Sequence, residues 1–140
     1  KCLEIPPETL FIHISGESNT ASHPTKELPL WTNAFTIITS RFSLRRLRFY
    51  QCSLNDSAVG LLCSYFPLLA WLNIRTRLFY SDENQVTDVG AIAIANSLQH
   101  LRVLYLSTIQ SHTARNRITF KGIIGAACLL VKLEEFYVCT

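Results

Sequence analysis

The residues that could catalyse a reaction or bind a metal are scattered along the sequence. The histidines and cysteines are His13, His23, His100, His112, Cys2, Cys52, Cys63, Cys128 and Cys139. Nucleophilic catalysis needs a nucleophile, a base and a group that orients the base, and no such set follows from these positions. The cysteine spacings match no zinc pattern, and the sequence has neither an HExxH motif nor a glycine-rich phosphate loop. We therefore expect no enzyme activity, no metal site and no cofactor.

The cysteines also bear on the compartment in which the protein folds. Five is an odd number, and Cys63 and Cys128 lie in apolar runs, where a reduced cysteine acts as a small apolar side chain. Cys52 could take part in redox or metal chemistry, but a structural role beside a turn is the more common use. We expect a reducing intracellular compartment, either the cytoplasm, the nucleus or the mitochondrion.

The composition indicates a globular chain with a substantial core. Of the 140 residues 49% are hydrophobic and 16% are charged, and the net charge is +3. This charge is low for a protein that binds nucleic acid by electrostatics, so nucleic acid is an unlikely partner. No apolar run approaches the roughly 20 residues of a membrane span, and Lys1 does not begin a signal peptide. We expect a fragment of a longer chain.

The elements that must position any site follow a repeated pattern. The motif L-x-x-L-x-L, with conservative replacements, starts at Leu44, Leu69, Leu101 and Leu133, so the starts are 25, 32 and 32 residues apart. Fifteen residues before each of the last three motifs is an apolar residue, followed by a helix N-cap type: Asn55, Thr87 and Thr119. Two patterns in one register favour a repeat architecture over an ordinary α/β fold with coincidental spacing.

Each repeat is predicted to contain a short strand, a loop and a helix. Leu47 and Phe49 alternate with Arg46, Arg48 and Tyr50, as in a strand with one buried face. The helix half has buried positions at i, i+3, i+4 and i+7 after a small residue. These small residues, Ala58, Gly90 and Gly122, are expected to let the helix and strand layers approach closely. One unit cannot cover both of its apolar faces, so neighbouring units must stack.

The repeat resembles leucine-rich repeats (LRRs) of the cysteine-containing kind found in F-box/LRR proteins. The best copy is LRRLRFYQCSLNDSAVGLLCSYFPLL, residues 44–69. Residues that match the family pattern are Cys52, Asp56, Asp88, Gly90, Gly122 and Pro67, whereas Phe66 and Phe120 replace its second cysteine and its aspartate. The resemblance implies an α/β solenoid like ribonuclease inhibitor, with four or five repeats, parallel strands on the concave face and helices on the convex face. It also implies that Cys52 hydrogen-bonds the turn of a neighbouring unit.

The organisation along the chain is less regular at the start. Residues 44–140 are predicted to be the LRR region, and residues 1–43 a divergent or capping unit. In this unit a strand is expected at 9–15, with Leu10 and Ile12 level with Leu47 and Phe49, and a helix at 30–42. That helix would bury the face that contains Trp31, Ala34, Phe35, Ile38 and Phe42.

The two later units are seven residues longer than the first, and the additional residues follow the strand. The insertions, 75–85 and 107–117, would lie side by side on one edge of the solenoid. Long surface loops cost little free energy, but adjacent loops are also common binding sites. Their role stays open.

Stacking the predicted strands aligns outward columns rich in arginine and aromatic residues. The candidate partner-binding residues on this concave face are Arg46, Arg48, Tyr50, Trp71, Asn73, Arg75, Tyr105 and Tyr137. His13 is expected in the column of Tyr50, at the opposite end from Cys139. Tryptophan, tyrosine and arginine anchor protein interfaces because they remove a large area from water and keep a polar group. Alternatively, the arginines simply cover the rings within the sheet.

These features lead to a ranked set of functions. The first is a non-catalytic scaffold that binds another protein through the concave face, and the family resemblance implies the substrate-recognition arm of an F-box ubiquitin-ligase adaptor. The second is a structural or assembly subunit of a large complex, which could be organellar. The third is an RNA-binding surface, because the same rings could stack bases. The oligomeric state and the partner's identity are not predictable from these residues.

Overall fold

The computed structural model describes residues 13–15, 28–40, 44–50, 54–74, 86–107 and 118–139. Cys52, Arg75 and the insertions at 75–85 and 108–117, for which the sequence made predictions, lie outside these ranges. The side chain of Tyr50 also lies outside them.

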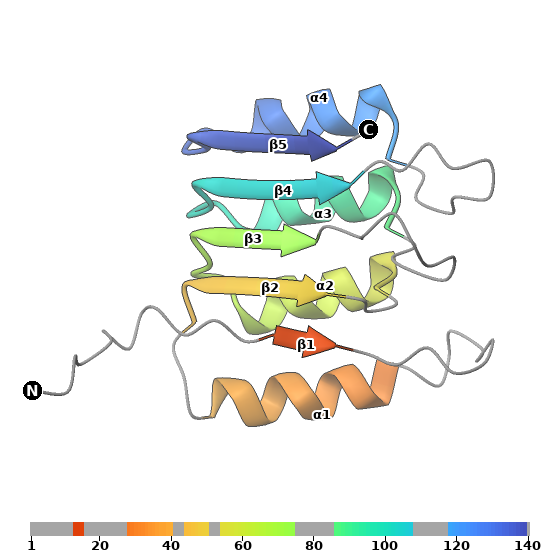
Figure 1. Ribbon diagram of the computed structural model, residues 1–140, viewed down its shortest axis with the longest axis vertical. Coiled ribbons are helices and arrows are strands. Elements are labelled where there is room, and N and C mark those ends of the chain that lie inside the picture. The colour runs from red at the N-terminus through yellow and green to blue at the C-terminus, as the bar shows by residue number, and fades with distance from the viewer. Residues whose placement is uncertain are drawn as a thin grey trace, which may run out of the picture.

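The chain forms an α/β structure with one parallel sheet and a layer of helices. The strands are β1 (His13–Ser15), β2 (Arg46–Tyr50), β3 (Trp71–Ile74), β4 (Val103–Ser107) and β5 (Glu135–Cys139). The helices are α1 (Leu28–Thr39), α2 (Asp56–Tyr65), α3 (Asp88–Ser97) and α4 (Phe120–Leu129). The sheet order is β1-β2-β3-β4-β5, and each helix packs on the next one along the chain (Figure 1). Strands and helices therefore form two layers in chain order.

The register of β2 to β5 agrees with the predicted columns, but that of β1 differs. Leu47 pairs with Leu72, Leu72 with Leu104, and Leu104 with Phe136. In β1, however, His13 lies opposite Arg48, so the prediction that His13 is level with Tyr50 was wrong by two residues. A shift of two residues keeps every side chain on the same face of a strand, so the alternation in the sequence could not detect it.

The predicted N-caps are confirmed for three helices. The Asn55 side chain accepts a hydrogen bond from the Ala58 amide at 2.9 Å. Thr87 and Thr119 accept one from the amide two residues ahead, at 3.1 and 3.2 Å. Each cap satisfies an amide that has no partner within the helix, which explains why these helices begin where the polar residue stands.

The core lies between the sheet and the helices. Leu47, Leu72 and Leu104 from the strands are fully buried, as are Leu62 and Ile94 from the helices. Burial of such apolar surface is the main favourable contribution to folding. The two layers therefore hold each other in place through the side chains that the sequence pattern assigned to the interior.

An aromatic cluster closes the core next to α1. Phe35 is fully buried, and its ring centroid lies 5.3 Å from that of Phe66 and 6.4 Å from that of Phe49. Trp31 and Ile38 pack against this core. The predicted buried face of the first helix is confirmed for these residues, although the helix begins at Leu28 and ends at Thr39.

Neighbouring helix N-termini are joined by aspartate carboxylates. Asp56 Oδ1 accepts hydrogen bonds from the amides of Thr87 and Gly90, at 2.8 and 3.0 Å, and its Oδ2 accepts one from the Thr87 hydroxyl at 2.6 Å. A Cβ added to Gly90 would meet Asp56 Oδ1 and would lie 2.7 Å from Val86 Cγ1. The sequence-based explanation for the small residues was therefore incorrect at Gly90, which makes room for a carboxylate rather than for the strand layer.

The same arrangement recurs one unit later and then stops. Asp88 accepts hydrogen bonds from the amide and the hydroxyl of Thr119, at 2.6 and 2.7 Å, and a Cβ on Gly122 would meet the Asp88 carboxylate. The position equivalent to Asp88 in α4 is occupied by Phe120, whose side chain is exposed. The series of carboxylate contacts therefore ends at α4.

In the part of the chain that the structure describes, no helix combines the length and the apolar character needed to cross a membrane.

Candidate functional site

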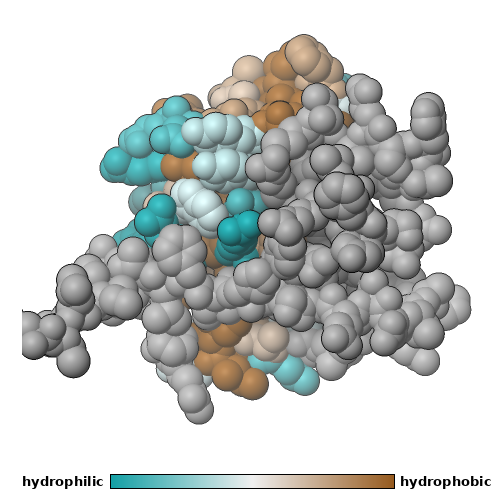
Figure 2. Space-filling view, viewed as in Figure 1, coloured by the Kyte–Doolittle hydropathy of each residue, from teal (hydrophilic) through white to brown (hydrophobic). Residues whose placement is uncertain are grey.

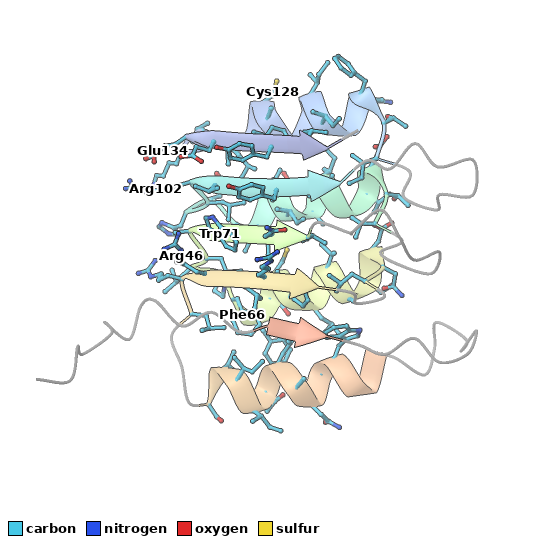
Figure 3. The ribbon with its side chains drawn as sticks, in the orientation of Figure 1. Arg46, Phe66, Trp71, Arg102, Cys128 and Glu134 are labelled. Atoms are coloured by element: carbon cyan, nitrogen blue, oxygen red, sulfur yellow. The ribbon has the colours of Figure 1, made fainter. Side chains whose placement is uncertain are left out.

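The predicted outward residues of β2 to β5 form two neighbouring columns on the sheet. One column contains Arg46, Trp71, Val103 and Glu135, and the other contains Arg48, Asn73, Tyr105 and Tyr137. The side opposite the helices is therefore lined by residues from four consecutive strands (Figure 3). We call this surface the strand face.

Rings on the strand face lie against one another in a series that crosses three strands. The guanidinium carbon of Arg46 lies 5.6 Å from the centre of the Trp71 ring. The Trp71 and Tyr105 centroids are 5.5 Å apart, and Tyr105 stacks on Tyr137 at 4.4 Å with 5° between the planes. Neighbouring strands are about 4.8 Å apart, so side chains at paired positions are spaced closely enough to stack. We call Arg46, Trp71, Tyr105 and Tyr137 the ring series.

Exposure differs along the strand face. Arg48 is exposed, Arg46, Trp71 and Tyr105 are half-buried, and 44% of the Tyr137 surface is exposed. Asn73 lies in its predicted column but is only 7% exposed. Its short side chain lies between the longer side chains of Arg48 and Tyr105, so Asn73 offers a partner almost no surface, contrary to what the sequence suggested.

The charges on this side of the molecule change sign from β2 to β5. Arg46 and Arg48 lie on β2, and Glu135 lies on β5 and accepts a hydrogen bond from the Tyr137 hydroxyl at 2.9 Å. This hydrogen bond raises the pKa of Tyr137, because it favours the protonated phenol. The strand face therefore offers a positive surface at one end and a negative one at the other.

Where the strands begin, charged residues flank the strand face. Arg102 and Glu134 form an ion pair at 2.9 Å, with both side chains more than half exposed. Such a surface pair contributes little to stability. Arg45 donates a hydrogen bond to the Leu68 carbonyl at 3.0 Å. Arg45, Arg102 and Glu134 were not among the predicted site residues, although each follows the first leucine of a leucine motif and so stands just before a strand.

The described cysteines and histidines lie on different elements of the structure. Cys63 is buried, and burial raises the pKa of its thiol to about 11 against the opposing effect of a hydrogen bond with Ser97. Cys128 is exposed on α4, and His100 is exposed in the turn after α3. His13 and Cys139 lie on the two edge strands of the sheet. Among the described residues, no three histidine, cysteine or acidic side chains are grouped as metal ligands.

Compared with known proteins, the chain matches no family model and no curated protein.

Proposed function

We propose that this chain is a non-catalytic leucine-rich-repeat solenoid that binds another protein through its strand face. The observation that carries the proposal is the ring series, a band of arginine and aromatic side chains across strands β2 to β5 that stays partly exposed. These residue types dominate the binding energy of protein interfaces. A sheet surface that served only to meet water would carry mainly small polar and charged side chains.

The repeat architecture is supported by contacts that recur at a constant distance along the chain. Asp56 binds Thr87 and Asp88 binds Thr119, in each case over 31 residues. Strands that follow one another in chain order in a parallel sheet, each joined to the next by a helix, are expected of an LRR solenoid.

Base stacking is less well supported than protein binding. One face of the Tyr105 ring is covered by Tyr137, and Trp71 and Arg46 lie against each other next to it. A nucleobase needs an open ring face on which to stack. Stacking uses one face of the Tyr105 ring and one face of the Tyr137 ring, and Arg46 lies over the Trp71 ring. The surface that is left combines rings with hydroxyl and guanidinium groups, which suits the mixed surface of a protein.

The test is an affinity purification from cell lysate with two matched triple variants, at low and at high salt. The first is Trp71→Ala/Tyr105→Ala/Tyr137→Ala, which removes the rings of the strand face. The second is Ile37→Ala/Leu68→Ala/Val89→Ala, which removes three exposed apolar side chains away from the strand face. Thermal melts of both variants establish that they fold.

A protein that is lost with the first variant and retained by the second would support the proposal, and ubiquitin-ligase subunits among such proteins would support the adaptor function. Proteins retained by both variants would contradict it. Recovery of RNA that high salt removes would also contradict it, because electrostatic binding to phosphates weakens steeply with salt.

A further inference from the structure

The strand face changes its chemical character from one strand to the next. Its two columns hold Arg46 and Arg48 on β2, Trp71 and Asn73 on β3, Val103 and Tyr105 on β4, and Glu135 and Tyr137 on β5. Figure 2, which faces the strands, shows mainly hydrophilic and neutral side chains over them, between hydrophobic ones at the two ends of the molecule. In the order of the strands, the two columns are therefore positive, then uncharged, then negative.

The opposite charges on the strand face are too far apart to neutralise each other. Three strand-to-strand steps of about 4.8 Å separate β2 from β5, which gives about 14 Å. Exposed charges are largely screened from one another beyond about 8–10 Å. Arg102 and Glu134 provide the contrast, because they precede adjacent strands and form an ion pair at 2.9 Å. The charges on β2 and β5 therefore do not cancel, and a partner that lies across the strand face meets both.

The positive end of the strand face is suited to carboxylates. Arg46 and Arg48 occupy alternate positions of β2, and Arg45 directly precedes this strand. Arg46 lies over the Trp71 ring, 5.6 Å from its centre, and this contact orients the guanidinium group while its charge is kept. The planar donors of a guanidinium group fit a carboxylate with two parallel hydrogen bonds. We therefore expect a partner to place aspartate or glutamate over β2.

The negative end of the strand face offers an acceptor to a basic group. Glu135 is exposed, and its paired neighbour on β4 is the uncharged Val103. Its Oε2 accepts a hydrogen bond from the Tyr137 hydroxyl at 2.9 Å, whereas an ionised carboxylate can accept about four. A lysine or an arginine of a partner can therefore bind the same carboxylate.

Between the two charged ends, the strand face is apolar and aromatic. Trp71, Val103 and Tyr105 are half-buried, so each still presents surface to a partner. An extended chain advances about 3.3 Å per residue, so about five residues cross the distance from β2 to β5. A single extended segment is therefore long enough to meet the positive, apolar and negative zones in order.

We propose that the strand face binds an extended segment of another protein that is acidic over β2, apolar over β3 and β4, and basic over β5. The charges at the two ends fix the direction in which the segment crosses the sheet, because the reverse direction brings like charges together. This inference rests on the proposed function, since it needs a partner on the strand face, and it adds the chemistry of that partner.

The probes for this inference are two labelled synthetic peptides of identical composition and net charge. The block peptide has glutamates at one end, leucine and tyrosine in the middle and lysines at the other end. The alternating peptide contains the same residues with glutamates and lysines interleaved. Fluorescence polarisation with the wild-type chain at low salt should show about tenfold tighter binding of the block peptide, because only this peptide matches both charged ends at once. Equal affinities, or no binding of either peptide, would overturn the inference.

Charge reversals test each end of the strand face separately. Arg48→Glu and Glu135→Lys should each raise the dissociation constant of the block peptide about tenfold, because an attraction becomes a repulsion. The matched control is Lys121→Glu, which reverses an exposed charge in the first turn of α4, where a negative charge is favourable. It should leave the dissociation constant unchanged. Thermal melts establish that the three variants fold, and equal weakening by Lys121→Glu and Arg48→Glu would overturn the inference.

A nitroxide label on the block peptide reports the direction in which it binds. Attached to the acidic end, the label should broaden the amide NMR signals of β2 more than those of β5. Attached to the basic end, it should broaden those of β5 more. Equal broadening of the two strands, or the opposite order, would overturn the inference.

The variant Trp71→Ala/Tyr105→Ala/Tyr137→Ala separates this inference from the proposed function. If this variant loses a protein partner from lysate and the wild type binds the two peptides equally, the strand face binds proteins without recognising this order of charges, and only the inference fails. If the variant keeps all partners of the wild type, the strand face is not the binding surface, and both fail.

Discussion

The helix N-termini and the strand face are built from the same strand–helix units but differ in how much they repeat. At the helix N-termini, the same threonine and aspartate contact joins α2 to α3 and α3 to α4. On the strand face, paired positions hold Arg46, Trp71, Val103 and Glu135, which share neither size nor charge. The residues that repeat are those that hold neighbouring units together. The residues that vary lie on the strand face, where no contact between units requires the same side chain on every strand.

The strongest test of this comparison is a change within the shared core. Leu104 is fully buried on β4, between Leu72 and Phe136 of the adjacent strands. Leu104→Ala should lower the free energy of unfolding by about 2–5 kcal/mol, because it leaves a cavity. Chemical denaturation measures the loss. The control Val103→Ala changes the neighbouring residue on the opposite side of the strand and should cost clearly less, so equal losses would contradict the observed register.

A glycine pair tests whether the carboxylate contacts stabilise the helix layer. A Cβ on Gly90 would collide with the Asp56 carboxylate, whereas Gly60 has nothing within 4 Å of an added Cβ. Gly90→Ala should therefore destabilise the protein by about 1–3 kcal/mol through overpacking and displaced hydrogen bonds. Gly60→Ala should stabilise it by about 0.5–1 kcal/mol, because alanine favours helix. Changes of the same sign in the two thermal melts would refute this account.

The buried thiol of Cys63 gives the core a dependence on alkaline pH. Burial raises its pKa from 9.0 to about 11, so the folded state holds the proton more tightly than the unfolded state. The resulting stability is fully present below pH 9 and is lost as the pH rises towards 11. Between pH 8 and pH 10 the loss should be about 1 kcal/mol. Denaturation curves of wild type and Cys63→Ala at pH 8 and pH 10 isolate the contribution of the thiol. If both proteins lose the same free energy of unfolding between these pH values, the thiol is not the cause of the loss.

The smallest effect on stability is expected on the strand face. Arg48 is exposed on β2, so Arg48→Glu should change the free energy of unfolding by no more than about 0.5 kcal/mol. The same substitution reverses a charge in the proposed binding surface and should weaken any partner of the strand face. Thermal melts together with a binding assay separate the two effects. Unchanged binding would indicate that partners contact another surface.

Much of the scaffold was predictable because its signals are local. The caps at Asn55, Thr87 and Thr119 and the buried leucines of the strands depend on residues close together in the chain. The candidate site was predictable in its columns, since the leucine motif aligned β2 to β5 correctly. It was not predictable in its exposure, because the burial of Asn73 depends on the size of its neighbours on two other strands.

The sequence by itself determined where α2, α3 and α4 begin and which strand residues point inward, because apolar periodicity and capping act over a few residues. It also determined how strands β2 to β5 align, because the leucine motif recurs in each of them. Tertiary structure alone decided which side chains meet across units. The Asp56 carboxylate beside Gly90 and the position of His13 opposite Arg48 are of this kind. The contact of Asp56 with Gly90 depends on the distance between neighbouring helices, and the register of β1 is left undetermined by two-residue periodicity where the leucine motif is absent.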